Sequence, residues 1–286
     1  MTIPPPYAED LHNWYVDLQN RICQSLEAIE QESLALDIYN AWEPQQFEKR
    51  PWDFAQSGGG CMSILQKGRV FEKAGVNVSC VWGEFAKEFA AQIPGALDDP
   101  RFWACGISLV VHPRNPYVPI VHMNTRHIIT TKSWFGGGAD LTPSIPFEED
   151  TQIFHQAFKQ CCDSHDASYY DKFKTWCDEY FYLSHRKEAR GIGGIFYDYH
   201  NTNNFDADRA FNNSVGETFL ETYPLIVRRR MAQVWGDAEL QTLQHKRGRY
   251  VEFNLIHDRG TKFGLQTGGN TEAILMSLPP TASWAA

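Results

Sequence analysis

The chain has 286 residues, of which 43% are hydrophobic and 21% charged, and its formal net charge is -9 at pH 7. The apolar fraction supports a sizeable core and excludes a disordered chain. The negative net charge gives no reason to expect nucleic acid as a partner, because proteins that bind nucleic-acid phosphates usually carry an excess of basic residues.

The seven cysteines are scattered, apart from the adjacent Cys161 and Cys162, and no C-x-x-C pair occurs. Scattered thiols in odd number are typical of a reducing compartment rather than of a disulfide framework. Residues 1–10 lack the pattern of a secretory signal, and no stretch is long and apolar enough to span a bilayer. We therefore expect a soluble, cytoplasmic protein with no membrane span.

The first predicted element is an amphipathic helix, because apolar residues recur every three or four positions from Leu11 to Ile29. Three glycines, 58–60, are expected to break the chain before a region rich in Val, Ile and Phe. Residues 107–111 and 120–129 are predicted as strands, the second opening just after Pro119.

Helices are predicted at 147–162, 168–186 and 206–236, the last one broken near Pro224. Residues 249–256 and 261–266 are predicted as two strands joined by 258–260, which implies antiparallel pairing. Because regular βαβ alternation is missing, the order favours an α+β fold, an antiparallel sheet covered by helices. No domain boundary is evident, so we expect one domain over residues 1–286.

The strand at 120–129 carries three polar side chains on one face, since successive strand residues point to opposite sides. These are His122, Asn124 and Arg126, whereas Thr125 and His127 share the other face. The pattern indicates either a polar site set into an apolar surface or a solvated sheet face. On the preceding strand, Ser108 and His112 share a face about 13 Å apart, so they could line one large flat ligand.

Histidines 112, 122, 155 and 185 are widely spaced and form no local metal-ligand motif, which favours ordinary hydrogen bonds. Glycines 136–138 and 191–194 lie beside aromatic residues, but neither a dinucleotide fingerprint nor a Walker loop is present. Such clusters permit close backbone approaches or form tight turns.

Basic residues gather late in the chain, at Lys246, Arg247, Arg249 and Arg259. Together with Arg126 they predict a polycarboxylate site, because arginine pairs bidentately with carboxylates. The alternative is a salt-bridge network with Glu252 and Asp258. Asp198, at the end of a run rich in glycine and aromatics, is a candidate acid–base or cation-stabilising group, or else a cap for the next helix.

Read together, these segments resemble the oxygen-dependent coproporphyrinogen oxidases. The similarity runs from about residue 50 to the C-terminus and is carried by GRVFEKAGVNVS (68–79), GISLVVHPRNPYVPIVHMNTRH (106–127), WFGGGADLTP (134–143), WCDEYFYLSHR (176–186), RGIGGIFYD (190–198) and RGRYVEFNLIHDRGTKFGLQTGG (247–269).

The resemblance implies a flat antiparallel sheet sandwiched by helices, acting as a homodimer. It implies conversion of coproporphyrinogen III to protoporphyrinogen IX, in which two propionates become vinyl groups. Dioxygen would be the oxidant, and no organic cofactor would be needed.

The resemblance also implies roles for individual residues. His122 would be the general acid or base, and Asp198 would face the pyrrole N–H groups. The substrate site would be formed by Ser108, Asn124, Thr125, Arg126, Gly268, Gly269 and Asn270, with Arg249 from the late basic cluster. His112, His155 and His185 occupy positions linked with a divalent metal.

One departure stands out, because Tyr199 follows Asp198 where the family usually has a second acid. The alternative function is therefore a tetrapyrrole-binding protein that has lost catalysis. A histidine–metal hydrolase is disfavoured by the absence of a local ligand motif and of a nucleophile elbow.

Overall fold

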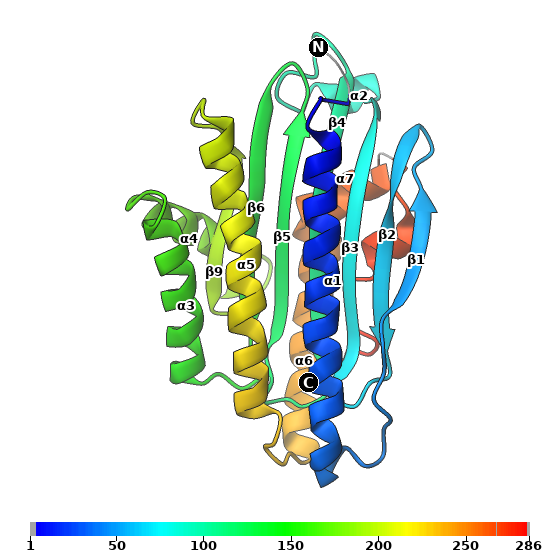
Figure 1. Ribbon diagram of the computed structural model, residues 1–286. Helices are drawn as coiled ribbons and strands as arrows, with labels where there is room; N and C mark the ends of the chain where they lie inside the picture. Colours follow the sequence, from blue (N-terminus) through cyan, green and yellow to red (C-terminus); the bar gives the residue numbers. More distant parts are fainter. Residues whose placement is uncertain (1–3, 267, 285–286) are drawn as a thin grey trace.

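The computed structural model describes residues 4–266 and 268–284. One large antiparallel sheet forms the centre, and helices α1, α3 and α5 cover one of its faces, here called the helical face (Figure 1). The C-terminal elements α6, η3, α7 and α8 lie behind the sheet in this view, on what we call the C-terminal face. The predicted α+β fold, a flat sheet between helices, is confirmed.

The main sheet has the strand order β1-β2-β3-β4-β5-β6-β9, with every neighbouring pair antiparallel. Its strands are β1 (Glu48–Asp53), β2 (Ser57–Gln66), β3 (Phe71–Glu84), β4 (Arg101–Pro113), β5 (Ile120–Ile129), β6 (Ser133–Thr142) and β9 (Gly193–His200). A separate short hairpin pairs β7 (Tyr182–Leu183) with β8 (Glu188–Ala189).

The helices connect and cover these strands. They are α1 (Ala8–Glu32), α2 (Lys87–Ala90), α3 (Glu148–Asp163), α4 (Tyr169–Tyr180), α5 (Phe205–Arg230), α6 (Asp237–Glu252), α7 (Arg259–Gln266) and α8 (Thr271–Leu275). Short 3-10 turns follow α1 at η1 (Ser33–Ala35) and η2 (Asp37–Tyr39), and the π-helical turn η3 (Phe253–His257) continues α6.

The main core lies between the sheet and the helical face. Leu11, Tyr15, Leu18, Ile22 and Leu26 of α1 are all buried there, which confirms the predicted amphipathic helix. Burial of this stripe against the apolar side of the sheet is the main force that holds the layers together. Among the residues described, no helix combines the length and the hydrophobicity needed to cross a membrane.

Several predicted elements are confirmed, and two helices are shorter than expected, because α5 ends at Arg230 instead of residue 236 and α4 is also cut short. Strand β5 has the predicted bounds, and α3 agrees within a residue at each end. Helix α4 ends at Tyr180 instead of residue 186, where the chain turns into the β7–β8 hairpin.

The predicted break at glycines 58–60 is wrong, because these residues lie inside strand β2. A Cβ on Gly60 would lie 2.5 Å from Cζ2 of Trp52 on the paired strand. Glycine therefore serves here to let an indole ring lie flat against the backbone, not to end the strand.

The predicted break at Pro224 is also wrong, since α5 runs continuously through it. Phe219, Tyr223, Ile226 and Val227 are all buried in the core on both sides of the proline. Their packing offsets the one missing backbone hydrogen bond.

The hairpin predicted at 249–266 is wrong, because this segment is helical from α6 through α7. From α6 into η3, buried residues follow each other at spacings of three or four, the period of a helix: Leu243, Arg247, Tyr250 and Asn254.

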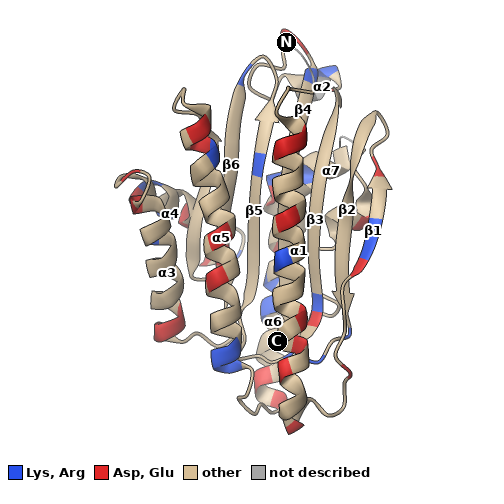
Figure 2. Ribbon diagram, viewed as in Figure 1, with Lys and Arg blue, Asp and Glu red and all other residues tan. Residues whose placement is uncertain are grey.

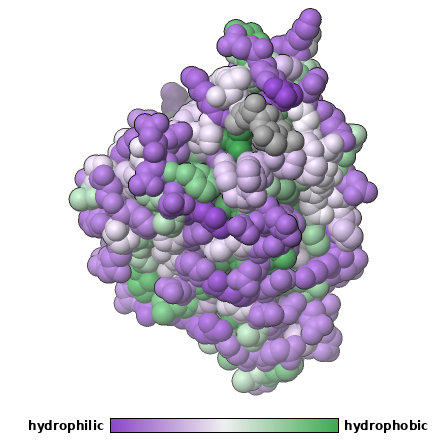
Figure 3. All heavy atoms as spheres, turned by 45° about the horizontal axis from the view of Figure 1, so that its top comes forward, coloured by the Kyte–Doolittle hydropathy of each residue, from purple (hydrophilic) through white to green (hydrophobic). Residues whose placement is uncertain are grey.

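The end of the molecule turned forward in Figure 3 is mostly hydrophilic, with hydrophobic residues scattered among the polar ones. The polar groups most relevant to function are instead partly enclosed, between the sheet and the C-terminal elements.

Candidate active site

A row of polar side chains runs along the C-terminal face of the sheet. His122, Asn124 and Arg126 alternate on β5 with the buried residues of the helical face, as predicted. Ser108 lies opposite Asn124 in the β4–β5 register, so it belongs to the same face. Arg126 is the only Lys or Arg residue of β5.

The row is joined by hydrogen bonds from end to end. His122 Nδ1 donates to Oδ1 of Asp140 at 2.9 Å, and His122 Nε2 accepts from the amide of Asn124 at 3.1 Å. The amide oxygen of Asn124 accepts from Arg126 Nη1 at 2.7 Å. This pattern holds the imidazole in one tautomer, with its proton on Nδ1.

Asp140 anchors the row. It lies opposite His122 in the β5–β6 register, and its side chain is 2% exposed. Its second oxygen accepts from Arg190 Nη2 at 2.6 Å. Burial opposes the charged form, but Arg190 and His122 outweigh it and lower the pKa of Asp140. The carboxylate is therefore ionised and able to orient His122.

Arg190 is held in an aromatic cage. Its guanidinium carbon lies 4.1 Å from the ring centre of Phe181 and 4.5 Å from those of Tyr250 and Phe253. Burial alone would lower the pKa of Arg190, but the charge of Asp140 raises it. Phe181 directly follows α4, whereas Tyr250 and Phe253 belong to α6 and η3, so the cage connects the C-terminal helices to the sheet at Asp140.

The other end of the row is closed by Asp198 on β9. Arg126 Nη2 lies 3.0 Å from Oδ1 of Asp198, and Arg259 Nη2 lies 4.0 Å from its Oδ2. A Cβ on Gly136 would come within 2.8 Å of Asp198 Oδ1 and 2.9 Å of Arg126 Cζ. Glycine in β6 therefore leaves the room in which this ion pair forms.

Asp198 is thus a strand residue facing two arginines. The cap of α5 is Asn204, whose side chain accepts from the N–H of Ala207. Tyr199, at the position where the family usually has a second acid, has a φ of 52° and stacks at a tilt against Trp134.

Thr125 lies apart from this row. It is fully buried on the helical face, as its place in the strand alternation requires, and is separated from the polar row by the sheet. Gly268 and Gly269 lie between α7 and α8, and Asn270 caps α8 by accepting from the N–H of Ala273.

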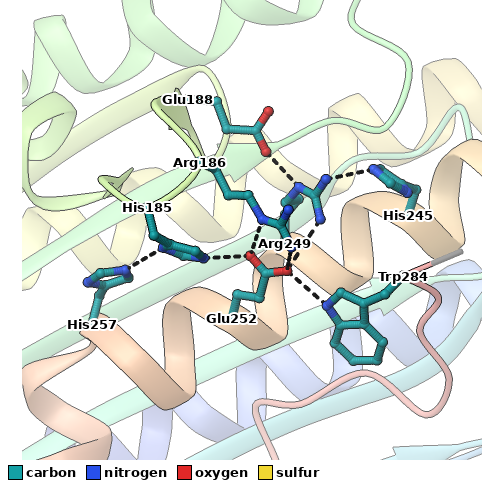
Figure 4. Close-up of polar contacts among 8 residues, drawn as sticks. All are labelled: His185, Arg186, Glu188, His245, Arg249, Glu252, His257 and Trp284. Atoms are coloured by element: carbon teal, nitrogen blue, oxygen red, sulfur yellow. Dashed lines mark hydrogen bonds and ion pairs between the residues drawn. The ribbon is translucent and has the colours of Figure 1, made fainter. Parts of the chain in front are cut away.

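Arg249 belongs to a second polar cluster, centred on Glu252 (Figure 4). Glu252 accepts from Arg186 at 2.6 Å, His185 at 2.7 Å, Trp284 at 2.9 Å and Arg249 at 3.3 Å. The bond from Arg186 is the main cause that lowers the pKa of Glu252 to about 2. Arg249 also donates to Glu188 at 2.8 Å, so its charge is met by carboxylates of the chain itself.

The three histidines of the predicted metal site lie apart. His112 donates to the carbonyl of Ser277, and burial lowers its pKa to about 3. His155, on α3, bonds to Tyr170 and to the carbonyl of Ile192. His185 bonds to Glu252 and His257. Within residues 4–266 and 268–284, no three His, Cys, Asp or Glu side chains come together as a metal site would require.

Two central residues, Asp140 and Arg190, were not singled out in the sequence. Both lie inside quoted motifs, Asp140 after glycines 136–138 and Arg190 before 191–194. Recognition of 133–142 as a strand paired with 120–129 would have placed an acid directly opposite His122. The register between strands was the missing signal.

The geometry defines an α+β protein with a candidate acid–base site on one sheet face, bordered by arginines suited to a carboxylated ligand. A model of the coproporphyrinogen III oxidase family matches residues 10–286. The chain therefore belongs to the coproporphyrinogen III oxidase family.

Individual relatives agree with this assignment. The chain is 53% identical over 273 residues to oxygen-dependent coproporphyrinogen-III oxidases of two Rickettsia bellii strains, covering 96% of both chains. It is also 53% identical over 268 residues to the protein of the same name from Rickettsia akari, covering 94% of this chain and 95% of the relative.

Proposed function

We propose that this chain catalyses the oxygen-dependent oxidative decarboxylation of coproporphyrinogen III to protoporphyrinogen IX, a step of haem synthesis. The observation that carries the proposal is the continuous row from Asp140 through His122, Asn124 and Arg126 to Asp198. Family membership and the names of the relatives support the same reaction.

The proposed substrate matches the chemistry of the row. A porphyrinogen with propionate side chains offers carboxylates to arginines, and 28% of the Arg126 side chain is accessible. The pyrrole N–H groups are donors, and Asp198 is an acceptor at the same end of the row. His122, held by Asp140, can give or take a proton at Nε2 if a substrate displaces the amide of Asn124.

Each propionate must lose carbon dioxide together with one hydrogen and an electron pair from the carbon next to the ring. Two electrons and one proton therefore leave the substrate for each vinyl group formed, and dioxygen takes up the two electrons with two protons to become hydrogen peroxide. We propose that Asp198 polarises the pyrrole N–H, which makes the ring electron-rich enough to react with dioxygen. His122 then passes a proton between the substrate and the reduced oxygen while the carboxylate leaves as carbon dioxide.

Dioxygen alone, without an organic cofactor, is the oxidant in this proposal. The histidines linked with a divalent metal do not fit one ion, because His155 lies on α3 at the helical face while His112 and His185 contact C-terminal residues. We derive no step through a metal. We expect turnover to survive exhaustive chelation by EDTA; loss of activity that added Mn²⁺ restores would contradict this.

We also propose a homodimer in the cytoplasm, as the family resemblance implies. The competing function is a tetrapyrrole-binding protein without catalysis, for which Tyr199 is the motivating departure.

The deciding experiment incubates the purified chain in air with freshly reduced coproporphyrinogen III, while oxygen uptake is recorded. Products are then oxidised and separated by chromatography. Protoporphyrin formed in air but not under argon, with oxygen consumed in proportion, establishes the oxidase. Tight porphyrin binding without oxygen uptake would instead establish the binding protein.

A further inference from the structure

A second group of charged residues lies where the turn between β2 and β3 meets the end of β4. It surrounds a cavity of about 400 Å³. The lining residues are Trp42, Gln66, Lys67, Glu72, Lys73, Arg114 and Pro280. Figure 2 shows a basic and an acidic residue next to each other near the lower end of β3.

Arg114 forms one wall of the cavity. Its guanidinium carbon lies 4.1 Å from the ring centre of Trp42, and Nε and Nη2 both donate to the carbonyl of Gly68. Its side chain is 12% exposed, and its nearest carboxylate, Glu72, lies 3.9 Å away. The guanidinium is therefore fixed in orientation but only weakly compensated in charge.

Glu72 has a closer partner. The fully buried Arg247 donates to Oε2 of Glu72 at 2.7 Å and to the carbonyl of Pro113 at 3.0 Å. A buried guanidinium is stable only with a paired carboxylate, so Glu72 neutralises Arg247 rather than the cations that line the cavity.

Two lysines complete the group. Lys73 is partly buried, and its ammonium donates to the carbonyl of Leu278 at 2.7 Å. Lys67 is exposed and has a φ of 62°, in the left-handed region. In the part of the chain that the structure describes, neither lysine forms an ion pair of the kind that Arg247 makes with Glu72.

Four cationic groups, Lys67, Lys73, Arg114 and Arg247, lie here with two carboxylates: Glu72, which pairs with Arg247, and Glu272, which acts on the charge of Lys73, so two positive charges remain. Behind them, Glu30 and Arg69 add one charge of each sign; Glu30 accepts from the backbone N–H groups of 69–71. This excess occurs in a chain with a net charge of -9. Lys73 and Arg114 are partly buried, and the carboxylate of Glu72 comes no closer to Arg114 than 3.9 Å, so a bound anion would stabilise both cations.

We propose that this cavity binds a small, multiply charged oxyanion of the polyphosphate or polycarboxylate class. Its volume lies within the usual range for small-molecule sites, roughly 300–1,000 Å³. Arg114, held against Trp42, presents a planar donor edge to such a ligand, and Lys67 and Lys73 supply further charge.

The cavity borders the C-terminal segment. Lys73 pairs in register with His112, and Leu278 and Ser277 accept from these two residues. Pro280 lines the cavity itself. A bound anion would therefore reinforce the contact between the sheet and residues 277–280, away from the polar row of the candidate active site.

The test is calorimetric titration of the full chain with inorganic pyrophosphate and, separately, with citrate, in buffer of low ionic strength. We expect saturable binding of at least one of them at one site; the tighter ligand tells phosphate from carboxylate chemistry. Lys67→Gly and Arg114→Gln should each weaken binding about tenfold, the effect of about 1.4 kcal/mol. Lys132→Ala, an exposed lysine on the β5–β6 turn, should leave it unchanged.

Lys67→Gly tests anion binding at this cavity even if Arg114→Gln fails to fold, because glycine adopts the left-handed backbone conformation without strain. Circular dichroism checks the fold of each variant. Absence of saturable binding for both anions overturns the proposal, and so does equal affinity in wild type and in Lys67→Gly, since the anion would then bind elsewhere.

Discussion

His122 and His127 lie on the same strand but project from opposite faces of the sheet. His127 stacks on Phe135, with ring centres 4.2 Å apart, and bonds to the hydroxyl of Ser133; burial lowers its pKa to about 3. His122 bonds to the ionised Asp140 and is 17% exposed. The His127 imidazole is therefore a neutral packing group, whereas the His122 imidazole is hydrogen-bonded to a charged carboxylate and is accessible to a ligand.

The two faces differ in the same way throughout. The helical face of β5 is apolar apart from Thr125 and His127, and it packs against helices α1 and α5. The C-terminal face carries ion pairs and is closed by α6 and η3 through the cage around Arg190. Strand alternation alone therefore separates a layer that stabilises the fold from a layer available for chemistry.

The largest effect is expected for Asp140→Asn. The substitution keeps the shape but leaves Arg190 as a buried cation without a counter-charge, so unfolding free energy should fall by about 3–5 kcal/mol. It also removes the negative charge that orients His122, so kcat should fall by roughly 10³-fold or more. Urea denaturation and steady-state turnover measure the two effects separately.

The matched control is Asp150→Asn. Asp150 is also a buried carboxylate, and it pairs with Arg230 at 2.6 Å, but it lies between α3 and α5 on the helical face. We expect a comparable loss of stability with kcat unchanged for the folded fraction. Equal loss of kcat in both variants would break the contrast between the faces.

Asp198→Ala should lower turnover far more than substrate affinity. The carboxylate is proposed to polarise the pyrrole N–H during reaction, so its loss removes an interaction that strengthens in the transition state. We expect kcat to fall roughly 10²–10³-fold, the usual range for an acid–base or electrostatic group. The exposed Asp206→Ala on α5 is the control, and an unaltered kcat for Asp198→Ala would remove this residue from the mechanism.

Arg126→Ala should chiefly weaken substrate binding, because its side chain is 28% accessible and a guanidinium suits a propionate. We expect KM to rise about tenfold to a hundredfold, equivalent to about 1.4–2.8 kcal/mol. Arg21→Ala, which removes an ion pair with Glu217 on the helical face, should leave KM unaltered. Normal saturation by coproporphyrinogen III in Arg126→Ala would argue against its role as carboxylate ligand.

The sequence alone predicts the α+β class and strand β5, because alternation along one strand is a local signal. It does not predict that Asp140 faces His122, since this depends on the register with a strand whose glycines 136–138 suggest a turn. The family resemblance also groups His155 with His112 as metal-linked positions, although α3 carries His155 to the other face. Distances across layers are not encoded in the spacing of residues along the chain.

The smallest effect on activity, but a distinct one on stability, concerns His127. Its pKa is about 3 in the fold against 6.5 for an ordinary histidine, so between these values the unfolded chain binds a proton that the folded chain excludes. Stability is therefore complete above pH 6.5 and is lost as the pH falls towards 3, by up to about 1.4 kcal/mol per pH unit from this residue. In His127→Phe this part of the slope should vanish, while kcat at pH 7 stays unchanged. Urea denaturation of both proteins at several pH values measures the difference in slope; parallel curves would show that His127 is protonated in the fold, and that the helical face is less dry than its packing implies.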